Sequence, residues 1–240
     1  MRIVPDVDME AFWDERAREN AAYFVDNQLD YERPDLETFW AGGEDVVARF
    51  EELLGFTVGA SDEVVEIGCG MGRLTRALKA RGASVRALDV SSEMLTRAHE
   101  SNRDLAGVEW LHGDGQTITG VPDASADGVF SHVVFQHIPD PRITYGYVAE
   151  MGRVLRAGGW AAFQVSNDPS IHRPQPGGRA LAHRALSVVG KRPKGSGHAA
   201  WLGSSVELGT LRATAADAGM DAERIVGEGT QYCLVLLRRR

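Results

Sequence analysis

A glycine-rich turn between an apolar run and a helical pattern is the feature that most constrains the fold of this chain. It occupies residues 64–73, with the sequence VVEIGCGMGR. Glycines permit positive φ, and they let a ligand approach the backbone without interference from a Cβ atom. A dinucleotide-binding turn has the spacing Gly-x-Gly-x-x-Gly, whereas here the third glycine is Gly72 and position 73 is arginine. Any one of these glycines can serve turn geometry alone, but the set favours a ligand site.

Short apolar runs alternate with helical patterns after this turn, which predicts an α/β fold with a mostly parallel sheet and helices on both faces. Near the end of the chain, two runs flank a Gly-Glu-Gly turn and predict an antiparallel hairpin at the sheet edge. The expected strands are 64–67, 84–88, 108–111, 128–131, 160–165, 223–226 and 231–237. The expected helices are 9–27, 35–54, one from Gly72 ending at Gly82, one from Ser91, 141–155, and one that follows a capping-box pattern at 204–207 and ends at Gly219.

Asp89 follows the second predicted strand, 17 residues after Gly72. Ligands bind beyond the carboxyl ends of parallel strands, and a carboxylate there can accept hydrogen bonds from both hydroxyls of a ribose. Considered alone, Asp89 fits a ribose-binding role and the role of an ordinary aspartate before a helix equally well. Following the glycine turn at this spacing, the ribose role is the better interpretation.

Composition excludes several classes of protein. Asp and Glu number 34 against 26 Lys and Arg, a net charge of -8, so we expect no nucleic-acid partner. Cys69 and Cys233 do not form a secreted disulfide framework, and no apolar stretch is long enough for a membrane span, so we expect a cytoplasmic protein with no membrane association. The histidines and cysteines lack zinc-type spacing, so we expect no metal. The oligomeric state is left open.

In order and spacing, these segments resemble the class I S-adenosylmethionine-dependent methyltransferases, of the bacterial small-molecule type, over roughly residues 60–165. The resemblance implies a Rossmann-like, seven-stranded sheet, with S-adenosyl-L-methionine as cofactor and S-adenosyl-L-homocysteine as product. It extends to the segments Gly113-Asp114-Gly115, Phe130-Ser131-His132 and 153–159. The cofactor-binding residues that we predict are Glu66, Gly68, Cys69, Gly70, Gly72, Arg73, Asp89, Val90, Met94, Gly113, Asp114, Gly115, Ser131 and Trp40.

Three of these residues have a second interpretation. Met94 either packs on the adenine or belongs to the core. Trp40 either closes over the cofactor or packs its own amphipathic helix. Arg73 either pairs with the cofactor carboxylate or is a solvated helix residue.

We expect one domain over residues 1–240. Its parts are an N-terminal helical cap at 1–58, a cofactor-binding core at 60–165, a lid-like insertion at 168–203, and a C-terminal helix and hairpin at 204–240. Between residues 168 and 200, six basic residues against the single acid Asp168 give a net charge of +5 on an acidic chain. This charge either offsets the acidic surface of the domain or recognises a polar or anionic small-molecule acceptor. The substrate-binding candidates are Arg173, Arg179, His198 and Trp201.

Methyl transfer is an in-line displacement that needs alignment, exclusion of water and sometimes a base. The catalytic candidates are His132 and His137, because both follow the fourth strand of the core. Their alternative role is to brace the loop through hydrogen bonds. Two rival functions stay open, namely a protein that binds S-adenosylmethionine for a non-methylating role such as cyclisation, and an NAD-dependent oxidoreductase, against which the glycine spacing argues.

Overall fold

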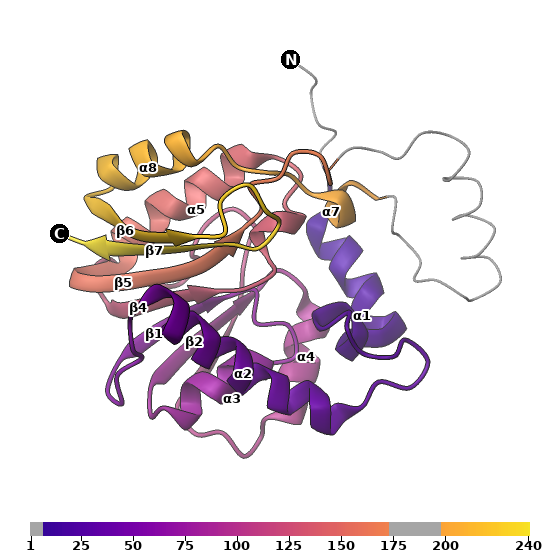
Figure 1. Ribbon diagram of the computed structural model, residues 1–240. Coiled ribbons are helices and arrows are strands. Elements are labelled where there is room, and N and C mark those ends of the chain that lie inside the picture. Colours follow the sequence, from indigo (N-terminus) through magenta and orange to yellow (C-terminus); the bar gives the residue numbers. More distant parts are fainter. Residues whose placement is uncertain (1–6, 173–197) are drawn as a thin grey trace.

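The computed structural model describes residues 7–172 and 198–240, which form a seven-stranded sheet with helices on both faces (Figure 1). The strand order is β3-β2-β1-β4-β5-β7-β6. Neighbouring strands from β3 to β5 are parallel, whereas β7 is antiparallel to both β5 and β6. The strands are β1 Glu63–Ile67, β2 Ser84–Asp89, β3 Val108–His112, β4 Ala126–Ser131, β5 Leu155–Val165, β6 Met220–Val226 and β7 Cys233–Arg239. The predicted α/β fold with its C-terminal hairpin is therefore confirmed.

The helices divide between the two faces of this sheet. One face packs under α5 and α8, and the opposite face packs under α2 and α3 (Figure 1). The helices are α1 Met9–Val25, α2 Leu36–Leu54, α3 Arg73–Ala80, α4 Ser92–Ser101, α5 Pro141–Val154, α7 Ala199–Leu202 and α8 Leu208–Asp217, with a 3-10 turn, η1, at Phe135–His137. Because both faces are covered, the central strands are almost continuously buried, as β1 and β4 show.

The start of β5 differs from the one that the sequence predicts. Helix α5 ends at Val154, one residue before its expected end, and β5 begins at Leu155 instead of residue 160, so that Gly158 and Gly159 lie within the strand. The register between β4 and β5 shifts at this point, from Ala126 opposite Leu155 to Gly128 opposite Trp160, so β5 accommodates the glycines as an irregularity within the strand.

The capping box expected at 204–207 is wrong. Helix α8 begins only at Leu208, and its N-cap Glu207 makes no capping hydrogen bond through its side chain. Ser204 instead donates to the carbonyl oxygen of Ile138 at 2.7 Å, which ties this segment to the loop after η1. Tertiary contacts therefore override the local signal.

Helix α1 lies across the end of the sheet, beside α4 and α7 (Figure 1). It packs through a small apolar cluster of Ala17, Ala21 and Met94, and its backbone departs from helical geometry at Asn20. Across the described ranges, we find no helix with the length and apolar character that a membrane span requires.

Candidate active site

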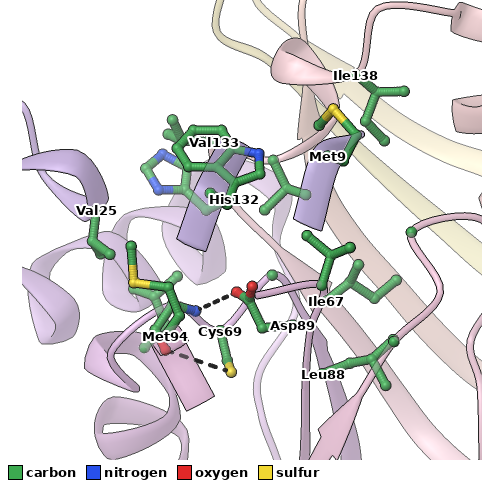
Figure 2. A pocket seen from close by; sticks show the side chains of 18 of the residues that line it. Met9, Val25, Ile67, Cys69, Leu88, Asp89, Met94, His132, Val133 and Ile138 are labelled. Atoms are coloured by element: carbon green, nitrogen blue, oxygen red, sulfur yellow. Dashed lines mark hydrogen bonds between the residues drawn. The ribbon is translucent and has the colours of Figure 1, made fainter. Parts of the chain in front are cut away.

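A pocket lies at the carboxyl ends of β1, β2 and β4 (Figure 2). Its walls come from the turn after β1, the ends of β2 and β3, the loop after β4, and helices α1 and α5. The lining residues are Met9, Trp13, Phe24, Val25, Ile67, Gly68, Cys69, Gly70, Arg73, Leu74, Leu88, Asp89, Val90, Met94, Gly113, Gly115, His132, Val133, Val134, Ile138, Ile143 and Tyr147. The structure thus brings together segments that are separate in the sequence at the edge where α/β folds bind their ligands.

The glycines of the turn have different surroundings, although all three have positive φ. Gly68 and Gly70 line the pocket, and a Cβ atom on Gly70 would lie 2.7 Å from Cγ2 of Val25 in α1. A Cβ atom on Gly72 would instead meet Asn102 and Trp110, at 2.7 and 2.8 Å, and Gly72 does not line the pocket. A Cβ atom on Gly68 would likewise meet Val134, so all three glycines permit close packing, and Gly68 and Gly70 do so while they also line the pocket.

Asp89 joins the glycine turn to the start of α4. Its Oδ2 accepts a hydrogen bond from the Gly70 N–H at 2.8 Å, and its Oδ1 accepts one from the Ser91 N–H at 2.9 Å. Burial raises the pKa of Asp89 above its ordinary value, although these backbone donors oppose the effect. Because each carboxylate oxygen can accept a second hydrogen bond, Asp89 keeps acceptor capacity toward the pocket that it lines (Figure 2). The turn and this carboxylate fit a ribose.

Glu66 lies behind the turn and does not line the pocket. Its Oε2 accepts a hydrogen bond from the Thr75 hydroxyl at 2.5 Å, while Oε1 is buried and makes no hydrogen bond to any described residue. Burial raises the pKa of Glu66 to about 7, and the nearby charge of Asp89 adds to the increase. In this arrangement Glu66 stabilises the glycine turn through its hydrogen bond with Thr75 at the start of α3.

Arg73 is buried at the pocket wall. Its Nη1 donates to Oδ2 of Asp26 at 2.7 Å, and its guanidinium lies over the ring of Phe39. Only 6% of the residue is exposed, so the alternative of a solvated helix residue is wrong.

The remaining predicted cofactor residues divide into two groups. Val90, Met94, Gly113 and Gly115 line the pocket with Cys69, and Met94 also packs against α1. Asp114, Ser131 and Trp40 do not line it.

Each of these last three residues has a local partner. The Asp114 carboxylate accepts hydrogen bonds from the N–H groups of Gln116 and Thr117. The Ser131 hydroxyl donates to the carbonyl oxygen of Ile67 at 2.9 Å. Trp40 lies under the guanidinium of Arg76, so the structure does not bring its ring to the pocket.

His132 and His137 occupy different environments. His132 lines the pocket, and its buried Nδ1 has no hydrogen-bond partner among the described residues. His137 does not line the pocket, because its Nδ1 lies 3.2 Å from the carbonyl oxygen of Trp201 and its ring is flanked by Trp13 and Trp201. Burial lowers the pKa of His132 to about 3 and that of His137 to about 4, so both rings are neutral at physiological pH. The contacts of His137 are those of a bracing residue.

Helix α1 supplies a wall that the sequence analysis did not assign to the site. Met9, Trp13, Phe24 and Val25 all line the pocket. An amphipathic pattern shows that a helix buries one face, but it does not show which part of the fold that face covers. No local signal in the sequence therefore distinguishes Trp13, which lines the pocket, from Trp40, which does not.

Asp14 fastens α1 to the loop that carries Asp89. Its Oδ1 accepts hydrogen bonds from the Ser91 hydroxyl at 2.6 Å and from the Glu93 N–H at 3.1 Å, while Arg18 pairs with Oδ2 at 3.2 Å. Burial alone would raise the pKa of Asp14, but the hydrogen bonds that its carboxylate accepts have the larger combined effect, so its pKa lies below the ordinary value. Because Ser91 also donates to Asp89, the helix that covers the pocket is linked to the pocket wall through one residue.

The predicted substrate-binding residues are only partly described. His198 stacks on Phe12 of α1, with ring centroids 4.5 Å apart, and accepts a hydrogen bond from the Ala200 N–H. Trp201 packs edge-on against Phe24. Arg173 and Arg179, with most of the lid-like insertion, lie outside the described residues.

Comparison with known proteins identifies a methyltransferase domain in this chain. A family model described as a methyltransferase domain matches residues 65–163. The trans-aconitate 2-methyltransferase of Mycolicibacterium gilvum is 38% identical over 115 residues, which are 46% of this chain and 41% of that protein. The malonyl-[acyl-carrier protein] O-methyltransferase of Hahella chejuensis is 34% identical over 119 residues, 49% of this chain and 39% of that protein. The chain thus matches about two fifths of the length of these relatives.

Solved structures share the fold. An S-adenosylmethionine-dependent methyltransferase from Mesorhizobium loti has a TM-score of 0.60 at 21% identity, covering 83% of this chain and 100% of that one. A phosphoethanolamine N-methyltransferase from Haemonchus contortus, solved with S-adenosylhomocysteine, has a TM-score of 0.53 at 20% identity, covering 75% of this chain and 37% of that one. Residues 65–163 of the chain therefore form a methyltransferase domain, and the chain has the fold of these solved S-adenosylmethionine-dependent methyltransferases.

Proposed function

We propose that this protein transfers a methyl group from S-adenosylmethionine to a small polar or anionic acceptor. The observation that carries the proposal is the hydrogen bond between Gly70 and Asp89, which sets a glycine cradle beside a carboxylate on one wall of the pocket. Gly68 and Gly70 would lie under the methionine part of the cofactor, and Asp89 would accept hydrogen bonds from the ribose hydroxyls.

The cofactor supplies an activated methyl group on a positively charged sulfur, so the protein has to align the acceptor and exclude water. Trp13 and Met9 of α1 cover the pocket and suit the exclusion of water. Arg73 lines the pocket and would meet the cofactor carboxylate while it stays paired with Asp26. No covalent intermediate on the protein is required.

His132 is the catalytic candidate whose side chain lines the pocket. A pKa of about 3 makes it a weak base, but its neutral ring can accept a hydrogen bond from a hydroxyl or amine acceptor and orient it for in-line attack. An acceptor that is already ionised, such as a carboxylate, needs no proton removed. His137 would act by holding the loop after β4 against Trp201.

A polar or anionic acceptor agrees with two observations. The relatives from Mycolicibacterium gilvum and Hahella chejuensis are named for trans-aconitate and a malonyl group, both of which carry carboxylates. The basic residues at 173–194, outside the described residues, provide charge that suits a carboxylate or phosphate through paired hydrogen bonds.

The test is formation of S-adenosylhomocysteine with a panel of di- and tricarboxylates, phenols and amines, with methylated products identified by mass spectrometry. We expect activity with a carboxylate, and loss of it in Gly70→Val, whose side chain would collide with Val25 where both residues line the pocket. Consumption of cofactor with no methylated product would favour the non-methylating rival. Tight binding of NAD but not of S-adenosylhomocysteine would favour the oxidoreductase.

The charge proposal is tested separately, once an acceptor is known. Arg173→Ala and Arg179→Ala should raise the acceptor KM, and added salt should do the same in the wild type because it screens the attraction. Unchanged KM values in both variants, with no effect of salt, would remove the anionic acceptor from the proposal and leave methyl transfer in place.

A further inference from the structure

Tyr147 is a buried pocket residue that the sequence analysis did not assign to the site. It lies in the middle of α5 and lines the pocket, yet only 4% of the residue is exposed. Its ring packs against Phe135 with the centroids 5.5 Å apart, which fixes the direction of the side chain. The phenol is therefore a rigid part of the pocket wall.

The hydroxyl of Tyr147 makes no hydrogen bond to any residue in the ranges 7–172 and 198–240. Unlike Nδ1 of His132, this hydroxyl oxygen is not fully enclosed by protein, so it opens onto the pocket that Tyr147 lines. Tyrosine hydroxyls inside proteins ordinarily have a hydrogen-bond partner. Burial and the carboxylates of Asp114, Asp89 and Glu150 raise the pKa of Tyr147 above its ordinary range, so the phenol keeps its proton. The pocket therefore contains a preoriented hydrogen-bond donor that lacks an acceptor.

The position of α5 locates this hydroxyl within the pocket. Glu150, three residues after Tyr147 on α5, accepts a hydrogen bond from the Ile118 N–H at 3.2 Å, so the helix lies against the segment that follows β3. Gly113 and Gly115 of this segment line the pocket with Tyr147, and the Gly113 N–H donates to the carbonyl oxygen of Asp89 at 2.8 Å. Because Asp89 is the residue that we assign to the ribose, Tyr147 lies at the nucleoside end of the pocket.

We infer that Tyr147 binds the nucleoside part of S-adenosylmethionine, donating a hydrogen bond from its hydroxyl to a ribose or adenine acceptor. This inference rests on the proposed function, since it needs the cofactor in this pocket. It adds α5 to the elements that hold the nucleoside, so that the ligand is held from the α5 face of the sheet as well as from the glycine turn.

The chain offers a matched control two residues away. Tyr145 is also on α5, but its hydroxyl accepts a hydrogen bond from the Glu207 N–H at 2.8 Å, and Tyr145 does not line the pocket. Tyr147→Phe removes a hydroxyl that has no protein partner, whereas Tyr145→Phe removes one that joins α5 to the start of α8. The two variants thus separate ligand binding from folding.

The experiment is calorimetric titration of the wild type and both variants with S-adenosylhomocysteine and with 5′-deoxy-5′-methylthioadenosine, which keeps the nucleoside and sulfur but lacks the amino acid part. We expect Tyr147→Phe to weaken both ligands by about tenfold with no loss of melting temperature. Tyr145→Phe should keep the wild-type affinities and melt at a lower temperature.

Three results overturn the inference. Wild-type affinities in Tyr147→Phe show that the hydroxyl does not contact the ligand. Weaker binding of S-adenosylhomocysteine alone places the hydroxyl at the methionine end. Equal loss of affinity in both variants shows an effect of α5 on folding. A wild-type chain that binds neither ligand overturns the proposed function itself, which keeps the two failures distinguishable.

Discussion

Replacing Asp89 with alanine tests the centre of the proposed site, and the structure predicts two separate costs. The first is to folding, because the Gly70 and Ser91 N–H groups lose their acceptor at 2.8 and 2.9 Å. The second cost is to cofactor binding, because the two ribose hydroxyls lose the carboxylate that would accept their hydrogen bonds.

The magnitudes follow from these contacts. A partly buried donor without an acceptor costs about 1–3 kcal/mol, so the two N–H groups together lower the free energy of unfolding by a few kcal/mol. In a chain of this size each kcal/mol corresponds to roughly 2–4 °C in melting temperature. Hydrogen bonds to a carboxylate contribute about 1.5–3 kcal/mol each, and a net loss of about 2 kcal/mol corresponds to roughly 30-fold weaker binding of S-adenosylhomocysteine.

The assay combines calorimetric titration with thermal unfolding, and Asp127→Ala is the control. Asp127 likewise accepts a backbone hydrogen bond, from the Glu63 N–H at 2.9 Å, but it lies at the amino end of β4, away from the pocket. Asp127→Ala should lower the melting temperature and leave affinity unchanged, whereas Asp89→Ala should lower both. A folded Asp89→Ala variant that binds S-adenosylhomocysteine as tightly as the wild type would refute the assignment of the ribose to this residue.

Three further predictions concern residues around the pocket. Asp14→Asn weakens the contact between α1 and Ser91, so S-adenosylhomocysteine should dissociate about tenfold faster in a stopped-flow experiment, and an unchanged rate would show that this contact does not hold α1 closed. Burial raises the pKa of Glu66 to about 7, so its carboxyl group is protonated in the folded chain at pH 5 and ionised in the unfolded one. The stability that the protonated Glu66 carboxyl group contributes is therefore lost as pH rises through 7. Measured by urea unfolding, the free energy of unfolding should fall less between pH 5 and pH 8 in Glu66→Gln than in the wild type. Equal falls in the two proteins would contradict this pKa. Replacing His132, which would face the acceptor, or His137, which braces the loop after β4, with alanine should lower kcat by at least about tenfold while the affinity for S-adenosylhomocysteine stays within about twofold. Wild-type turnover in both variants would show that neither the His132 ring nor the braced loop contributes to methyl transfer.

The sheet was predictable because its signals are local. The apolar residues of β1, β2 and β4 cluster in short segments that are separated by helical patterns, and the glycine turn marks where the first strand ends. The positions of Gly68, Gly70 and Asp89 followed from the same rule, since residues at the carboxyl ends of neighbouring parallel strands meet at one edge.

What the sequence did not reveal depends on tertiary packing. Trp13 and Trp40 both lie on amphipathic helices, and only the docking of α1 beside α4 shows which ring reaches the pocket. Tyr147 reads as one more apolar position of α5, because nothing local indicates that its hydroxyl lacks a partner. The link from Asp14 to Ser91 joins residues 77 positions apart, beyond the reach of any periodicity.

The most direct test of the central claim is a crystal structure of the chain with S-adenosylhomocysteine. We expect the ribose hydroxyls within hydrogen-bond distance of the Asp89 carboxylate, the amino acid part over Gly68 and Gly70, and the sulfur toward the end of β4 near His132. Density for the ligand at any other place on the chain, or a ribose that makes no contact with Asp89, would contradict the site proposed for the cofactor.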